Sequence, residues 1–239
     1  MIAPRLVHEL AAVVDLTHTD SSAEVVYNRV VETARRTIPG CDGASFVLWC
    51  AEPPRLHVAT HPDIAQIDET QFQVREGPGL TAMRQCALVE LPDTLRDPEW
   101  PAYSTFAVHR GVRCCLATAF ELPDGLGLLQ LYATAPGRLT AELEPELALI
   151  ARYTRAAARN IRVYSRAQAQ AQQMRAARES SVVIEEAKGI LMHAYGCDAD
   201  AAFDRLRRMS QQGQVKLATV AQMLVRQVSA GPAADGARP

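Results

Sequence analysis

The segment EEAKGILMHAYG, residues 185–196, has the composition of a strong helix, because Glu, Ala, Lys, Leu and Met all favour helical backbone. Gly189 lies in its middle, directly after Lys188, and a glycine there costs about 1 kcal/mol relative to alanine. The glycine either lets another helix pack closely or lets the backbone of a ligand approach. The segment closes a predicted helix over residues 178–195, and Gly196 supplies the stop.

Two further amphipathic helices are predicted after this one. Asp198 caps a helix that ends near Gly213, and the next helix covers residues 216–228. Each helix has one apolar stripe of a few turns, which is too little to be stable alone. The three helices are therefore expected to form a small bundle over residues 178–229.

Basic side chains gather in this bundle. Arg205, Arg207 and Arg208 share the second helix, and Lys216 is placed in the first turn of the third. A cation beside the free N–H groups of a helix start can form an anion site. However, residues 175–228 carry eight Lys and Arg against six Asp and Glu, a net charge of only +2. Charge alone therefore does not separate a nucleic-acid surface from ordinary solvated side chains.

The bulk composition sets further limits. The chain has 239 residues, of which 48% are hydrophobic and 22% charged, and its formal net charge is -2. These values are typical of soluble globular proteins and favour neither nucleic acid nor membrane as a partner of the whole chain. We expect a cytoplasmic protein, since neither a secretory signal nor an apolar run of about 18 residues is present. The six cysteines fit no zinc pattern, so no metal or cofactor is expected.

The N-terminal part mixes helical and strand patterns. Two helical segments come first, followed by short strand-like runs, further helical segments, and two strands joined by the turn Pro123-Asp124-Gly125. This order predicts an α+β domain over residues 1–138, an antiparallel sheet with helices packed against it. The Gly/Ala/Pro-rich residues 230–239 are expected to be a disordered tail.

A helix over residues 139–177 is expected to connect the two parts. A 4-3 spacing gives it a seam that is apolar at first and weakens toward its end. The seam consists of Leu143, Leu147, Ile150, Thr154, Ala157, Ile161, Tyr164, Gln168 and Ala171. It predicts a coiled-coil homodimer, and the alternative is a helix whose first half packs on its own sheet.

The predicted bundle closely resembles the ANTAR family of bacterial RNA-binding modules. The matching runs are AKGILM at 187–192, AF at 202–203, LRR.S at 206–210 and KL..VA at 216–221, in the same order across three helices. ANTAR modules bind paired RNA hairpins in nascent transcripts and prevent a terminator from forming. The resemblance therefore implies a regulator of transcription antitermination.

The resemblance and the charges together give a set of candidate RNA contacts. The set comprises Lys188, Gly189, Arg205, Arg207, Arg208, Ser210, Gln214 and Lys216. Arg205 is the weakest cation, because Asp200 and Asp204 on the same helix can pair with it. Gln214 stands where many relatives have Asn before the third helix, and we expect it to be a poorer cap. Val215 and Ala218 replace residues that are often basic, so the RNA surface is less cationic than usual.

The residues before Arg138 resemble the GAF sensory fold through EGPGLTAM (76–83), DPEWP (97–101) and GLGLLQLY (125–132). The order of sensor, helix and ANTAR module is similar to actinobacterial GAF–ANTAR regulators. It implies that a signal in the first domain controls RNA binding by shifting helix geometry or dimerisation. A small-molecule cavity is expected under residues 100–111. Its candidate lining is Trp100, Tyr103, Phe106, His109 and Arg113.

Three other functions compete with RNA binding. An enzyme is not expected, because no GxSxG, HExxH or P-loop occurs and no catalytic or metal-binding residues are assigned. A DNA-binding helical regulator would need a polar recognition helix, and the third helix, KLATVAQMLV, is too apolar for that role. A dimerisation or protein-interaction module with a weakened RNA site stays open as the last alternative.

Overall fold

The computed structural model describes residues 4–15, 22–50 and 56–229. The chain divides into two compact units, Met1–Ser165 and Arg166–Pro239. The predicted disordered tail at 230–239 lies outside the described residues. Within the described ranges, no helix is long and apolar enough to cross a membrane.

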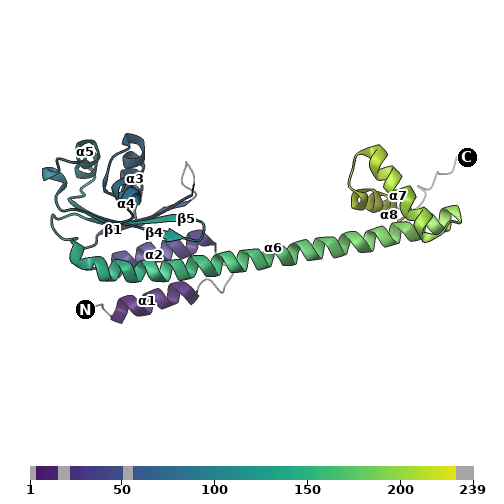
Figure 1. Cartoon of the computed structure of the whole chain (residues 1–239), viewed down its shortest axis with the longest axis horizontal. Helices are drawn as coiled ribbons and strands as arrows, with labels where there is room; N and C mark the ends of the chain where they lie inside the picture. Colours follow the sequence, from purple (N-terminus) through teal and green to yellow (C-terminus); the bar gives the residue numbers. More distant parts are fainter. Residues whose placement is uncertain (1–3, 16–21, 51–55, 230–239) are drawn as a thin grey trace, which may run out of the picture. The chain divides into compact units, whose positions relative to one another are not determined.

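The first unit contains a five-stranded antiparallel sheet with the strand order β2-β1-β5-β4-β3 (Figure 1). The strands are β1 (Gly43–Trp49), β2 (Leu56–Ala59), β3 (Leu88–Leu91), β4 (Cys114–Leu122) and β5 (Gly125–Ala133). β4 and β5 pair along their whole length, because the predicted Pro-Asp turn joins them directly. The predicted antiparallel sheet is therefore confirmed.

Helices cover both faces of this sheet (Figure 1). On one face lie α1 (Pro4–Asp15), α2 (Ala23–Thr37) and the first part of α6 (Glu144–Tyr195). On the other lie α3 (Pro62–Val74), α4 (Pro78–Gln85) and α5 (Pro101–His109), and the short 3-10 turns are η2 (Thr94–Arg96) and η3 (Ala141–Leu143). The alternation of β5 serves both layers, since Leu129 and Leu131 enter the α2 side and Leu128 and Tyr132 the α3 side.

Helix α6 begins at Glu144, five residues after the predicted start of the connecting helix, and continues without a break through the first helix of the predicted bundle. At its start, Leu147, Ile150 and Ala157 are buried in the core that also holds β5. The first half of the predicted coiled-coil seam is therefore covered within the chain, as in the alternative considered for it. The coiled coil stays a prediction for the residues after Ile161.

The second unit contains a three-helix bundle formed by the end of α6, α7 (Ala199–Gly213) and α8 (Leu217–Ser229). Its core consists of Ala187, Leu191, Ala202, Leu206, Val220 and Ala221. The local signals hold as predicted, since Gly196 has a left-handed φ of +60° and Asp198 accepts the N–H of Ala201 at 2.8 Å. The predicted bundle is confirmed.

Candidate functional site

Lys188 and Gly189 lie next to each other on α6 but in different surroundings. The Lys188 side chain is 17% exposed, and its Nζ lies 3.0 Å from both carboxylate oxygens of Glu185. Gly189 is exposed, and no atom of the described chain stands within 4 Å of the place a Cβ would take. The described chain thus offers no helix that packs against Gly189, so contacts within one copy do not explain the glycine. Open space beside the glycine is what a ligand backbone would need.

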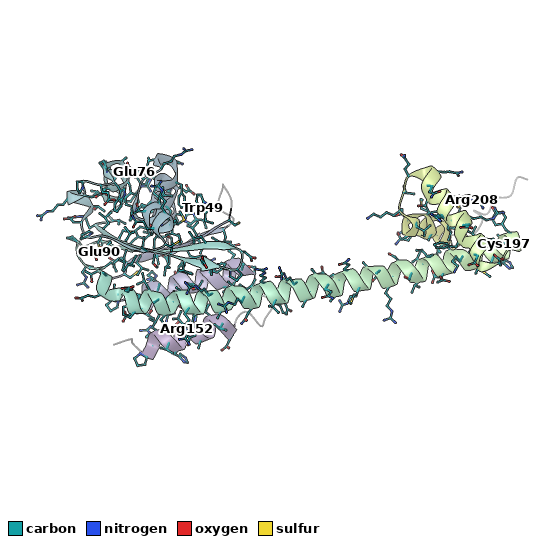
Figure 2. All side chains as sticks on the ribbon, in the orientation of Figure 1. Trp49, Glu76, Glu90, Arg152, Cys197 and Arg208 are labelled. Carbon is teal, nitrogen blue, oxygen red and sulfur yellow. The ribbon has the colours of Figure 1, made fainter. Side chains whose placement is uncertain are left out.

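The three arginines of α7 do not share one face. At about 100° of rotation per residue, Arg208 lies about 60° around the helix axis from Arg205. Arg207 lies about 160° from Arg205, and the buried Leu206 lies between these two arginines. The predicted pairing of Arg205 with acids on its own helix is wrong, because its guanidinium lies over the Tyr195 ring, 4.3 Å from the ring centroid. Arg208, labelled on α7 in Figure 2, donates from its Nε to a backbone carbonyl of the same helix at 3.4 Å.

The turn between α7 and α8 gives the remaining candidates defined places. The Ser210 hydroxyl donates to the Val215 carbonyl at 2.6 Å, and the Val215 N–H donates back to the Ser210 carbonyl at 3.2 Å. Gln214 ends α7 with a left-handed φ of 51°. Lys216 directly precedes α8 instead of lying in its first turn, and its carbonyl accepts the N–H groups of Thr219 and Val220.

These placements show that Gln214 belongs to the end of α7 and not to the start of α8. It was expected to be a poorer cap for the third helix, but it closes α7 in the left-handed region. Asn adopts that conformation more readily than other non-glycine residues, because its short side chain can bond to the local backbone. The departure from the family's Asn therefore costs backbone strain at the end of α7 and takes no capping bond from α8.

The candidate ligand residues of the first unit separate into different environments. Trp100 is buried at the start of α5, and with Arg113 it lines a cavity of about 740 Å³. The Arg113 guanidinium lies 2.8 Å from the Asp93 carboxylate, which together with its hydrogen bonds lowers the pKa of that acid. This cavity is the one that best fits the predicted sensory site.

The other three candidates do not line that cavity. Tyr103 is fully buried against the sheet, and the Phe106 ring lies under the Arg110 guanidinium at 5.1 Å from its centroid. His109 is exposed in the last turn of α5. The expected common lining is therefore wrong, because a helix of nine residues turns successive side chains toward core, neighbour and solvent.

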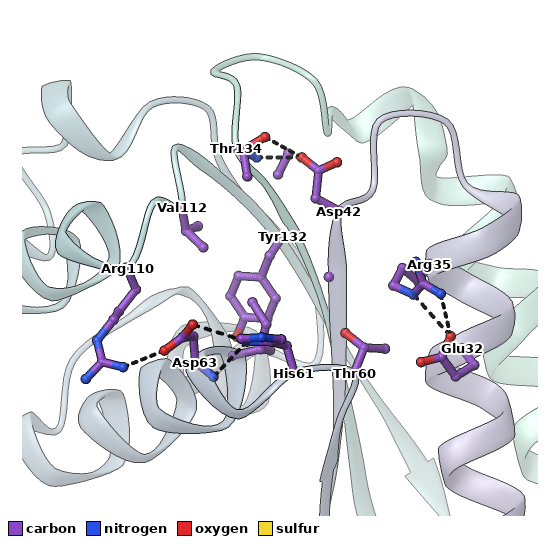
Figure 3. Close-up of a pocket in the computed structure, with 13 residues that line it drawn as sticks. Glu32, Arg35, Asp42, Thr60, His61, Asp63, Arg110, Val112, Tyr132 and Thr134 are labelled. Atoms are coloured by element: carbon purple, nitrogen blue, oxygen red, sulfur yellow. Dashed lines mark hydrogen bonds and ion pairs between the residues drawn. The ribbon is translucent and has the colours of Figure 1, made fainter.

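A second cavity, of about 300 Å³, lies where β1 begins and β2 and β5 end (Figure 3). Its wall pairs its own charges: Arg110 Nη1 lies 2.6 Å from the Asp63 carboxylate, and Thr134 donates to Asp42 through its N–H and its hydroxyl. These paired groups leave little for an ionic ligand to neutralise. The sequence did not single out this cavity.

A buried polar cluster between the sheet and α3 also escaped the sequence analysis. Asp68 is fully buried, and its carboxylate accepts hydrogen bonds from Gln130 and from the Tyr132 hydroxyl and lies 2.7 Å from His57 Nε2. Gln71 extends the network, donating to Gln130 Oε1 at 3.0 Å. Burial raises the pKa of Tyr132, and the charge of Asp68 adds to it, so the hydroxyl stays protonated. These partners satisfy a charge that would be very costly alone.

This cluster and α5 explain the EGPGLTAM motif as structure. The N–H of Gly79 donates to Gln71 Oε1 at 3.0 Å, and a side chain at Gly79 would collide with Gln130. Glu76 Oε1 accepts the N–H of Ala102 at 2.8 Å and so satisfies the first turn of α5. The motif therefore fixes α4 and α5 over the polar cluster.

The His57–Asp68 pair predicts a pH-dependent stability. Burial lowers the pKa of His57, but the hydrogen bond and charge of Asp68, helped by Glu69, outweigh it and raise that pKa above its ordinary value. A His whose pKa is raised in the folded state contributes its full stabilisation of the fold below the unfolded-state pKa of about 6.5. This stabilisation is lost as the pH rises through the folded-state pKa. Urea unfolding at intervals from about pH 6 to about pH 9 should show this loss. His57→Gln should remove it, and an equal pH profile in that variant would contradict the assignment.

Comparisons with known proteins place these features. The bundle with its exposed cations is a small helical module. The family model of the ANTAR domain matches residues 172–225, so this module is an ANTAR domain. No match was found among the curated proteins.

The chain is similar to several solved structures at low identity, among them a GAF domain. The GAF domain of a phosphoenolpyruvate-protein phosphotransferase from Coxiella burnetii is 15% identical, with 70% of this chain and 97% of that chain covered and a TM-score of 0.48. Free methionine-R-sulfoxide reductase from Neisseria meningitidis is 10% identical, with 69% and 96% covered and a TM-score of 0.49. SdiA from Escherichia coli is 15% identical, with 94% and 98% covered and a TM-score of 0.47. These distant likenesses say nothing of ligand or activity, and none supports an actinobacterial origin.

Proposed function

We propose that this chain is a signal-responsive RNA-binding regulator of transcription antitermination, acting in the cytoplasm and without catalytic activity of its own. The ANTAR match over the bundle carries the proposal. The free cations of the bundle support it, since Arg207, Arg208 and Lys216 form no ion pair with any residue the structure describes. Such cations are available for phosphate groups.

The RNA expected at this surface is a hairpin in a nascent transcript. A-form stems hide their base edges in a deep groove, whereas a loop presents unstacked bases that side chains can reach. Cations on α7 and before α8 would hold the phosphates, and the open space beside Gly189 would admit the RNA backbone. Binding would then compete with formation of the terminator.

We also propose that a signal acts on the first unit and that two copies of the chain associate. Helix α6 contributes Ile150 to the core of the first unit and Leu191 to the core of the bundle, so repacking around a ligand or protein signal can alter the same helix that binds RNA. The cavity beside Trp100 is the proposed place for a small molecule. We propose that a homodimer forms along the seam of α6 after Ile161 and presents two RNA sites.

The double variant Arg207→Ala/Lys216→Ala tests the RNA site. We expect its affinity for hairpin RNA to fall by about tenfold or more, and its salt dependence to drop by about two units of log K against log salt, because two phosphate contacts are lost. Gel shifts with a pool of RNA hairpins of constant stem and randomised loop, repeated at several salt concentrations, measure both quantities. Arg226→Ala, which removes an exposed arginine of α8, is the matched control.

Two outcomes would contradict the proposed RNA binding and favour one of the alternatives. Tighter binding of duplex DNA than of hairpin RNA would favour the DNA-binding alternative. Absence of binding to either at low salt, with self-association intact, would favour the interaction module.

A further inference from the structure

One aromatic side chain at the end of α6 is exposed beside the bundle core. Tyr195 is 59% exposed, although the neighbouring turns of α6 bury Ala187 and Leu191. A tyrosine whose role was packing would place its ring in that core. Instead the ring is held at the surface, with the Arg205 guanidinium 4.3 Å from its centroid. The ring and the cation therefore form a pair that is open to a ligand.

The hydrogen-bonding capacity of Arg205 is not used by carboxylates of its own helix. Asp200 and Asp204 are near in sequence, yet the described structure gives Arg205 no ion pair with either. A guanidinium over an aromatic ring is attracted to the ring face through its charge, and this leaves its N–H groups directed elsewhere. Arg205 can therefore stack and donate hydrogen bonds at the same time.

The surroundings mix cations with apolar surface. At about 100° per residue, Lys188, Met192 and Tyr195 fall within an arc of about 60° on α6, and Met192 is 37% exposed. Arg208 lies on the Arg205 side of α7. Glu185 neutralises part of this charge through its ion pair with Lys188.

Such a mixture fits unpaired nucleotides better than a paired stem. A stem offers phosphates and sugars, for which cations suffice, whereas an unstacked base needs a flat side chain to replace its lost stacking. Aromatic rings and arginine planes supply that surface, and each stacked base contributes strongly to binding.

We infer that Tyr195 and Arg205 form the subsite for one unpaired base of the RNA loop. The base stacks on the ring-guanidinium pair, and Arg205 or Arg208 binds the adjoining phosphate. This inference rests on the proposed RNA binding and adds to it the residues that distinguish a loop from a continuous duplex.

The experiment uses the full chain and hairpins selected from the randomised-loop pool by the wild type. Each loop position is replaced in turn by the fluorescent base 2-aminopurine, whose emission reports stacking. We expect one position to respond to the wild-type protein, and Tyr195→Ala to abolish that response and weaken hairpin binding by about tenfold. Tyr195→Phe should retain both, because it keeps the ring. Arg205→Lys should lose part of the affinity, because it keeps the charge without the plane.

The controls separate this inference from the proposal beneath it. Met223→Ala removes an exposed apolar side chain of α8 and should bind as the wild type does. Tyr195→Ala should leave affinity for loop-free duplex RNA unchanged and, by circular dichroism, should melt like the wild type. If wild type selects hairpins but Tyr195→Ala binds them equally, with the same fluorescence response, the base subsite at Tyr195 and Arg205 is refuted while RNA binding stands. If wild type selects no hairpin, both are refuted.

Discussion

Replacing Asp68 by alanine is expected to lower the free energy of unfolding of the first unit by about 3–5 kcal/mol, because it removes a fully buried carboxylate that pairs with the partly exposed His57. The loss leaves the Tyr132 hydroxyl and the Gln130 amide without their acceptor in the core. His57 would lose the partner that favours its charged form. The expected effect is therefore larger than that of any surface change in this unit.

Urea unfolding followed by tryptophan fluorescence measures this effect, since both tryptophans, Trp49 and Trp100, belong to the first unit. Glu69→Ala, at the exposed neighbouring position of α3, is the matched control and should change stability by less than about 0.5 kcal/mol. An Asp68→Ala variant as stable as this control would show that the buried cluster does not support the fold.

The second large effect is expected for Leu206→Ala in the bundle. Leu206 is fully buried in a core of six buried residues, so truncation should cost about 2–5 kcal/mol and unfold a module that has little else to bury. Hairpin binding should be lost with the fold, measured by gel shift and by the helical signal in circular dichroism. The tryptophan transition of the first unit should stay at its wild-type urea concentration.

Met209→Ala controls for this change, because Met209 lies on the same helix and is exposed. It should keep the bundle folded. If Leu206→Ala binds hairpins like the wild type, the three-helix fold is not needed for binding, and a short basic segment would be the RNA site.

The sequence predicted the bundle well because its signals are local. The cap at Asp198 and the stop at Gly196 act within a few residues, and the apolar stripes need only helical spacing to be recognised. The antiparallel sheet was also predictable, since the turn before Gly125 joins two apolar runs. The contact of Arg205 with the Tyr195 ring could not be predicted. Two acids on the same helix, Asp200 and Asp204, are nearer to Arg205 in sequence than the ring is.

The polar cluster could not be predicted because its members are distant in sequence. Asp68 and Gln130 are 62 residues apart, and only the folded sheet brings them together. One signal was present: Gln130 interrupts the apolar run GLGLLQLY, and a polar side chain in a buried strand requires a partner. The covering of the first half of the coiled-coil seam could not be predicted for a related reason, since apolar residues such as Ile150 look the same whether their own sheet or a second copy covers them.

Crosslinking of RNA to the protein in its native cells, followed by sequencing, tests RNA binding by the bundle. We expect wild type to recover transcripts carrying paired hairpins ahead of a terminator, with crosslinks in the loops, and Leu206→Ala to recover none above background. Recovery of the same RNAs by both proteins, or of none by the wild type, would contradict RNA binding by the ANTAR bundle.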